Sequence, residues 1–337
     1  MKAARAEQWD SRAQQRVQRH AGFPMLDVLP EAHPRRFAAW AAGVLFLVTT
    51  AGGARGFGQN PPSSPRTPSA APSGPAIATV PQPGQKQPQA KTPEEAAAYQ
   101  ALLGEQKPDE RIHLVEDFLL QFPDSEMREF AYRAGMQAYQ AKNDFNHLLI
   151  YGELALAENP DNLTALLTLS AAISEMTDRN DSEREEKLDD GERYAVHALE
   201  VIGKLHKPPG FPDERWAEIR HESESTAHAA RGLIALLRED FVKAELELKE
   251  AVALARRPDA VVLYRLGLSY SFQRKYEAAL EVLDRAVALG GIKLNAGGGK
   301  TRDLVAEAKE FAAKGLAAAP PAATPATAAG PASSPVP

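Results

Sequence analysis

One spacing of aromatic and small residues occurs three times in the sequence, and this repetition constrains the fold more than any other feature. In each copy the first residue is followed by three others at steps of 6, 3 and 7. The copies are Tyr139, Phe145, Leu148 and Ala155; Ala235, Phe241, Ala244 and Ala251; and Tyr270, Tyr276, Ala279 and Ala286. Two copies also place a glycine three residues before the first member, Gly232 and Gly267. Matched steps over three copies indicate a repeated structural unit.

The repeated small residues predict close packing between two short antiparallel helices. Glycine and alanine let two helix backbones approach closely, and the aromatic residues fill the space beside these contacts. A single pair leaves one face bare, so neighbouring pairs must stack to cover it. From about residue 92 to 315 apolar residues recur every three or four positions, without the alternation of a strand. The sequence therefore predicts an all-α stack of helix pairs.

This pattern resembles the tetratricopeptide repeat (TPR) family, whose unit has about 34 residues of helix, turn and helix. The segments "NDFNHLL", "EDFVKAE" and "RKYEAAL" stand at the turn into the second helix, and "ENPDN" closes its repeat as in the family. The resemblance implies an α-solenoid of antiparallel helix pairs. The expected repeats are 92–125, 129–162, 163 to about 205, 225–258 and 260–293.

Some irregularities separate this chain from a uniform repeat. The first repeat has Arg111 and Phe118 where small residues belong, so it is a degenerate or capping unit. The third repeat requires nine extra residues, around 177–185, in its turn. One long helix, capped near Asp213, is expected before the fourth repeat.

The amino-terminal region carries a targeting signal. Residues 37–54 are 18 residues without a charge that follow two arginines and end in small residues, and this arrangement predicts a secretory signal peptide. An uncleaved membrane anchor and a buried helix are the alternatives. The basic lead 1–36 is long for a signal peptide, so we hypothesise that residues 1–24 are a start-site artefact and that translation begins at Met25. A short cytoplasmic arm is the alternative.

The helical repeat domain, predicted at 94–317, lies between two Pro-rich segments. Residues 55–93 and 318–337 contain few large apolar side chains and are predicted to be a disordered linker and tail. The linker is a spacer in part polyproline II, or alternatively a PxxP ligand. Residues 1–55 hold 8 Lys/Arg and 4 Asp/Glu, which leaves 31 basic and 41 acidic residues and a net charge of −10 for the rest. This balance speaks against nucleic acid as a partner.

Three segments partly match known nucleotide- or metal-binding motifs, but each lacks a residue that its motif requires. "AGGGKT" at 296–301 lacks the first glycine of a phosphate loop and follows a helix, so it predicts a glycine-rich helix stop before a final helix from Thr301. The acidic stretch 178–190 spaces its carboxylates like a calcium loop but has Glu183 where glycine is required. His221 and His228 lack HExxH and a third ligand, which favours a plain helix surface. The chain has no cysteine, and we predict no cofactor, metal or catalytic residue.

The resemblance to the TPR family implies a partner-binding groove lined by fixed positions of each first helix. The alternative is that these side chains pack against neighbouring helices, because an apolar stripe at helical spacing usually belongs to a core. The implied lining residues are Phe130, Arg133, Gln137, Gln140, Leu167, Glu175, Leu233, Tyr264, Leu268 and Phe272.

The sequence thus predicts a non-catalytic scaffold that binds a protein or peptide in the bacterial cell envelope, in the periplasm or tethered to the membrane. "VEDFLLQFPDSEMREFAYRAGMQAY" is loosely similar to envelope repeat proteins that serve outer-membrane assembly. Two alternatives stay open. One is a structural spacer or self-associating assembly factor, and the other is an enzyme with its site in the insertion near 178–190, at Asp181, Glu183 and Asp189.

Overall fold

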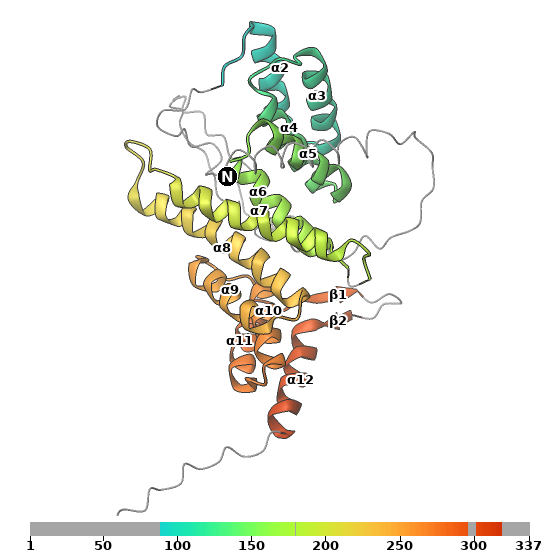
Figure 1. Cartoon of the computed structure of the whole chain (residues 1–337), viewed down its shortest axis with the longest axis vertical. Helices are drawn as coiled ribbons and strands as arrows, with labels where there is room; N and C mark the ends of the chain where they lie inside the picture. Colours follow the sequence, from blue (N-terminus) through green and yellow to red (C-terminus); the bar gives the residue numbers. More distant parts are fainter. Residues whose placement is uncertain (1–87, 179, 296–300, 319–337) are drawn as a thin grey trace, which may run out of the picture.

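A computed structural model describes residues 88–178, 180–295 and 301–318. The predicted signal or anchor at 37–54 and most of both Pro-rich segments lie outside these residues. Within them, no helix has the length and apolar character that crossing a bilayer requires. The described chain forms a long column of helices (Figure 1). Its first helices are α2 (Pro93–Gly104), α3 (Pro108–Gln121), α4 (Arg128–Ala141), α5 (Phe145–Glu158), α6 (Leu163–Met176) and α7 (Arg184–Lys204).

The helices pack as antiparallel neighbours, each pair on the next. Within the described residues the pairs are α2 with α3, α4 with α5, α6 with α7, α8 with α9 and α10 with α11, and consecutive pairs also contact each other. This arrangement confirms the predicted all-α stack of TPR-like helix pairs. The second half of the column consists of α8 (Asp213–Leu237), α9 (Phe241–Leu254), α10 (Ala260–Phe272), α11 (Tyr276–Ala288) and α12 (Leu304–Ala318).

The turn between the two helices of a pair has the same geometry in three repeats. A residue with positive φ ends the first helix: Asn143 at 57°, Glu239 at 62° and Arg274 at 61°. The next amide then donates 2.9 Å back to a carbonyl five residues earlier, which satisfies one of the free carbonyls at the helix end. In two of the repeats an aspartate at this place also caps the second helix through its side chain. The donor and acceptor pairs are Asp144 to Tyr139, Asp240 to Ala235 and Lys275 to Tyr270.

Small residues lie where the helices of a pair meet. A Cβ added to Gly232 would be 2.5 Å from Leu248 Cγ, and one added to Gly267 would be 2.6 Å from Leu283. The six alanines of the repeated spacing, together with Leu148, are at most 1% exposed. The small residues therefore face the packed seam, as the sequence predicts. These residues are Leu148, Ala155, Ala235, Ala244, Ala251, Ala279 and Ala286.

The α4–α5 pair reaches the same packing with large and small residues exchanged. Met136 stands where the later repeats have Gly232 and Gly267, and it is completely buried. Its sulfur would lie 3.1 Å from a Cβ on Gly152, which takes the place of the leucine of the other pairs. One large and one small residue thus fill the seam in all three pairs, but in α4–α5 the large one comes from the first helix.

The structure corrects the sequence prediction at two helix starts. A final helix was expected from Thr301, but Thr301–Asp303 is strand β2, which pairs antiparallel with β1 (Lys293–Asn295). Helix α12 begins at Leu304 because the Asp303 carboxylate accepts hydrogen bonds from the next helical amides, at 3.1 and 3.0 Å. The long helix expected from near Asp213 is α8, but Asp213 does not cap it. Asp213 is its first residue and its carboxylate pairs with Lys207, while the cap position, Pro212, has no side-chain hydrogen bond.

Candidate functional site

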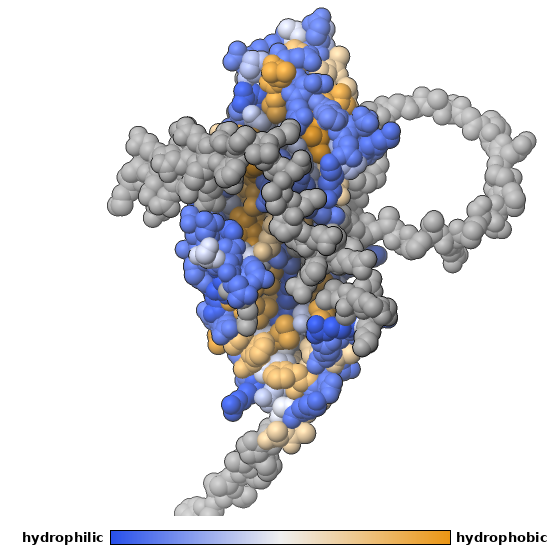
Figure 2. Space-filling model, turned by 90° about the vertical axis from the view of Figure 1, so that its right-hand side faces the viewer, coloured by the Kyte–Doolittle hydropathy of each residue, from blue (hydrophilic) through white to orange (hydrophobic). Residues whose placement is uncertain are grey.

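The predicted lining residues come from the first helix of four successive pairs, α4, α6, α8 and α10. Leu167 is the fifth residue of its repeat, Leu233 and Leu268 are the ninth residues of theirs, one helical turn further on, and all three are half-buried. Figure 2 shows apolar residues in a strip along the long axis of one face, between hydrophilic borders. Half-buried leucines thus occur on three successive first helices of the stack, where each offers some apolar surface.

At the amino-terminal end, α2 covers part of the predicted lining. The Phe130 ring packs edge-on against Tyr99 of α2, with centroids 6.4 Å apart. The Arg133 guanidinium lies 5.0 Å from the Phe130 ring centre, and Arg133 is only 6% exposed. Burial lowers the pKa of Arg133, against the opposing influence of Tyr99 and Glu129. These residues belong to the packing of α2 on α4, and whether they also bind a partner stays a prediction.

Gln137 offers an unused hydrogen-bond donor on α4. Its side-chain Nε2 is buried and has no acceptor among the described residues. Gln140, one turn later, is also half-buried. Leaving a buried amide donor unpaired costs about 1–3 kcal/mol, and a partner's acceptor would recover this free energy only if the Gln137 side chain turned outward to meet it. A peptide carbonyl has the right chemistry to supply it.

At the other end of the stack, α12 covers part of the predicted lining. Tyr264 and Leu268 pack against the cluster that joins α10, α11 and α12, which includes Leu283 and Val305. Burial and the nearby Glu307 carboxylate raise the pKa of the Tyr264 hydroxyl. Sequence reasoning missed this contact, because no repeat pattern places the helix that follows the last pair.

Phe272 is the predicted lining residue that stays most exposed, at 51%. Its ring stacks on Phe241 of α9, with centroids 4.7 Å apart, and lies 5.9 Å from Phe311 of α12. Phe311 is itself 49% exposed. The structure therefore groups Phe272 with other aromatic rings at the C-terminal end of the stack.

Glu175 does not point freely into a groove. Its carboxylate pairs with Arg265, 90 residues later in the sequence, and the two side chains are 20% and 11% exposed. The ion pair links the end of α6 to α10 across the intervening pair. Removing either partner of an ion pair this well shielded would leave the other charge partly buried without compensation.

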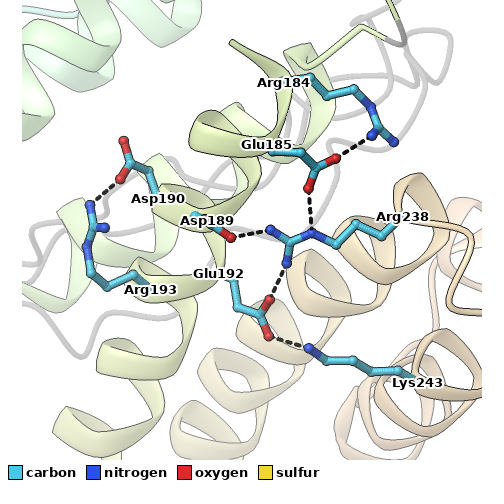
Figure 3. A network of polar contacts seen from close by, with 8 residues as sticks. All are labelled: Arg184, Glu185, Asp189, Asp190, Glu192, Arg193, Arg238 and Lys243. Atoms are coloured by element: carbon cyan, nitrogen blue, oxygen red, sulfur yellow. Dashed lines mark hydrogen bonds and ion pairs between the residues drawn. The ribbon is translucent and has the colours of Figure 1, made fainter.

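The acidic insertion forms a network of ion pairs with the neighbouring pair of helices (Figure 3). The extra residues of the third repeat form the segment between α6 and α7, and the acidic residues of α7 face the turn between α8 and α9. Arg238 in that turn pairs with Glu185 at 3.1 Å, with Glu192 at 2.7 Å and with Asp189. Lys243 binds the second oxygen of Glu192.

The cations around the acidic insertion lower the pKa of two of its neighbouring carboxyl groups. Burial would raise the pKa of Glu192, but the hydrogen bond from Lys243 and the charges of Lys243 and Arg238 hold it below its usual value. Asp181, one of the residues considered for catalysis, accepts a hydrogen bond from Lys187 at 2.6 Å, and this bond lowers its pKa. These carboxylates are thus held as charged partners of cations. No group of three or more His, Asp or Glu residues suited to a metal ion occurs among the described residues.

The sequence predicts that His228 lies on a plain helix surface, and this prediction is wrong. His228 lies at the contact between α8 and α9. Its Nδ1 lies 2.7 Å from Glu247 Oε2, and Arg231 binds the other oxygen of Glu247 at 2.9 Å. Glu247 is only 5% exposed, and its two polar neighbours compensate for the water that its carboxylate loses on burial. His221, two turns earlier, is exposed, as predicted.

No family model matches the chain, and no curated protein does. Among solved structures, the chain is similar to the crystal structure of a thermophilic TPR protein in Thermus thermophilus, with 19% sequence identity and a TM-score of 0.39. The similarity covers 66% of this chain and 99% of that chain. The TPR-like fold rests on this chain's own helix pairs and on the turn that they repeat.

Proposed function

We propose that this protein is a non-catalytic scaffold that binds another protein or a peptide along the first helices of its stack. The observation that carries the proposal is the occurrence of half-buried leucines on consecutive first helices, Leu167 on α6 and Leu233 on α8. Leu268 on α10 is also half-buried, but it is covered in part by α12. A partner that covered them would gain hydrophobic free energy that the chain alone leaves unused. The unpaired Gln137 Nε2 would add a donor for a partner carbonyl if its side chain turned outward on binding.

The chemistry of this surface favours an apolar partner segment. The resemblance implied Arg133 as a lining cation, but this arginine is buried under α2. The lining therefore has no free cation to clamp a terminal carboxylate among the residues named for it. We expect recognition through apolar side chains and backbone carbonyls, with the leucines as energetic centres.

We further propose that the protein acts in the cell envelope. The support is the uncharged run 37–54 with its basic lead, followed by a Pro-rich linker that would hold the helical stack away from a membrane. The enzyme alternative has less support, because Asp181 and Asp189 are bound to Lys187 and Arg238.

The proposal is tested by affinity capture from envelope extract with the full chain as bait. Replacing Leu167 and Leu233 by Gln keeps their size but removes the apolar contacts, and we expect partner recovery to fall about tenfold or more. The control is Leu120→Gln on α3, because Leu120 is 80% exposed and outside the predicted lining. Equal recovery by all three baits contradicts the proposed surface. Sedimentation of the wild-type chain distinguishes a binder of other proteins from a self-assembling one.

A further inference from the structure

Three phenylalanines from separate helices form a row at the C-terminal end of the stack. Phe241 opens α9, Phe272 ends α10, and Phe311 lies in α12. The first two rings stack with their planes 21° apart, and the third tilts by 48° against Phe272. Residues 70 positions apart in the sequence thus build one continuous aromatic surface, which we call the aromatic row.

The aromatic row is too small for a stable dimer but large enough for a short extended segment. Two phenylalanines at 51% and 49% exposure leave about 200 Å² of ring surface accessible. A stable protein–protein interface buries about 800 Å² on each partner. Stacked, partly exposed rings are the kind of surface on which proline rings of a polyproline II segment pack.

We propose that the Ala/Pro-rich segment 319–337 of this chain binds to its own aromatic row. The segment carries no charge, and its largest apolar groups are proline rings and one valine. It starts at the end of α12, seven residues beyond Phe311, which is about 10 Å along the helix. A polyproline II chain advances about 3 Å per residue, so about four residues return it to the level of Phe311. The remaining residues then suffice to pass Phe272 and Phe241.

The other Pro-rich segment fits the aromatic row less well. Residues 55–93 have the same class of side chains but also carry Arg55, Arg66, Lys86 and Lys91. They enter the stack at α2, which lies at the opposite end of the column from α12 (Figure 1). A tail attached beside its site has a local concentration in the millimolar range, which makes even weak proline–aromatic contacts effective. This inference is independent of the partner in the proposed function.

The test uses contact quenching in the full chain. Because the chain has no cysteine, Ser333→Cys gives a single site for a bimane label in the tail. Phe272→Trp places a quencher in the aromatic row, while Leu120→Trp places one on α3 as the control. We expect the label to be about two-fold dimmer with Phe272→Trp than with Leu120→Trp, as for a tail that is docked about half of the time. Adding Phe311→Ala should restore the intensity.

Each outcome decides the proposal. Equal intensities in the two tryptophan variants overturn it, provided that circular dichroism shows both to be folded. If Phe272→Trp does not fold, Phe311→Trp provides the same reading from the neighbouring ring. Quenching that rises with protein concentration assigns the bound tail to a second copy and overturns docking within one chain. Quenching of a label at Ser63→Cys, with none at Ser333→Cys, assigns the row to the linker and also overturns the proposal.

Discussion

Replacing Gly232 by alanine tests whether the fold depends on the close approach of α8 and α9. The new Cβ would lie 2.5 Å from Leu248 Cγ, 2.7 Å from its Cδ2 and 3.3 Å from its backbone nitrogen. The leucine is completely buried, so its side chain has little room to turn away. The helices must separate or Leu248 must leave its rotamer, and both changes cost packing free energy.

The size of the effect follows from two opposing contributions. Overpacking a tight core costs about 1–3 kcal/mol, whereas glycine to alanine inside a helix gains about 1 kcal/mol. The net loss for Gly232→Ala is therefore about 0–2 kcal/mol. Gly203 in α7 is the matched control, because an added Cβ there meets nothing within 4 Å. Gly203→Ala should gain about 0.5–1 kcal/mol, so the two variants should differ by about 1–3 kcal/mol.

The assay is urea unfolding followed by circular dichroism, with a double-mutant cycle on Leu248. Leu248→Ala alone should cost about 2–5 kcal/mol because it leaves a cavity. In that background Gly232→Ala should cost nothing or gain stability, since the clashing atoms are gone. The reasoning is refuted if Gly232→Ala is as stable as Gly203→Ala, or if the cycle shows no coupling between the two positions.

Three further predictions concern the turns and the ion-pair network. Arg274→Gly should stabilise the chain by up to about 1 kcal/mol in urea, because φ at this position is 61°, whereas Arg274→Ala should not. Arg238→Ala should lower stability by about 1 kcal/mol at low salt and by less in 1 M salt, because Glu185, Asp189 and Glu192 lose their common partner. The pKa of Glu192 is below its usual 4.5 in the folded chain, so its contribution is present above about pH 4.5 and is lost as the pH falls through the folded pKa. The difference in melting temperature between wild type and Glu192→Gln should therefore shrink from pH 7 to pH 3, and a constant difference would contradict this assignment.

The helix pairs were predictable because their packing requires small residues at fixed intervals. Gly232, Gly267 and the alanines of the second helices are visible in the sequence, and the structure buries them. The nine-residue insertion in the third repeat was also readable, since allowing for it brings Ala198 into line with Ala155 and both are completely buried. Local spacing was sufficient here, because the helices of a pair are neighbours in the sequence.

The rest was not predictable because it depends on residues far apart or on the ends of the stack. No spacing rule connects Glu175 to Arg265, or Arg238 to the acidic residues of α7. The lining implied for the second and last repeats ignores α2 and α12, which cover Arg133 and Tyr264 in part. The strands β1 and β2 are three residues long, which is too short for an alternating pattern to appear.

The most direct test of the account is photo-crosslinking from single positions of the full chain in living cells. A photoreactive amino acid at Leu167 or Leu233 should join the protein to one and the same partner. The same probe at Leu120, exposed on α3, should not yield this product. A product formed equally from Leu120, or none from either lining position while the chain is folded, would contradict the claim that the first helices form the binding surface.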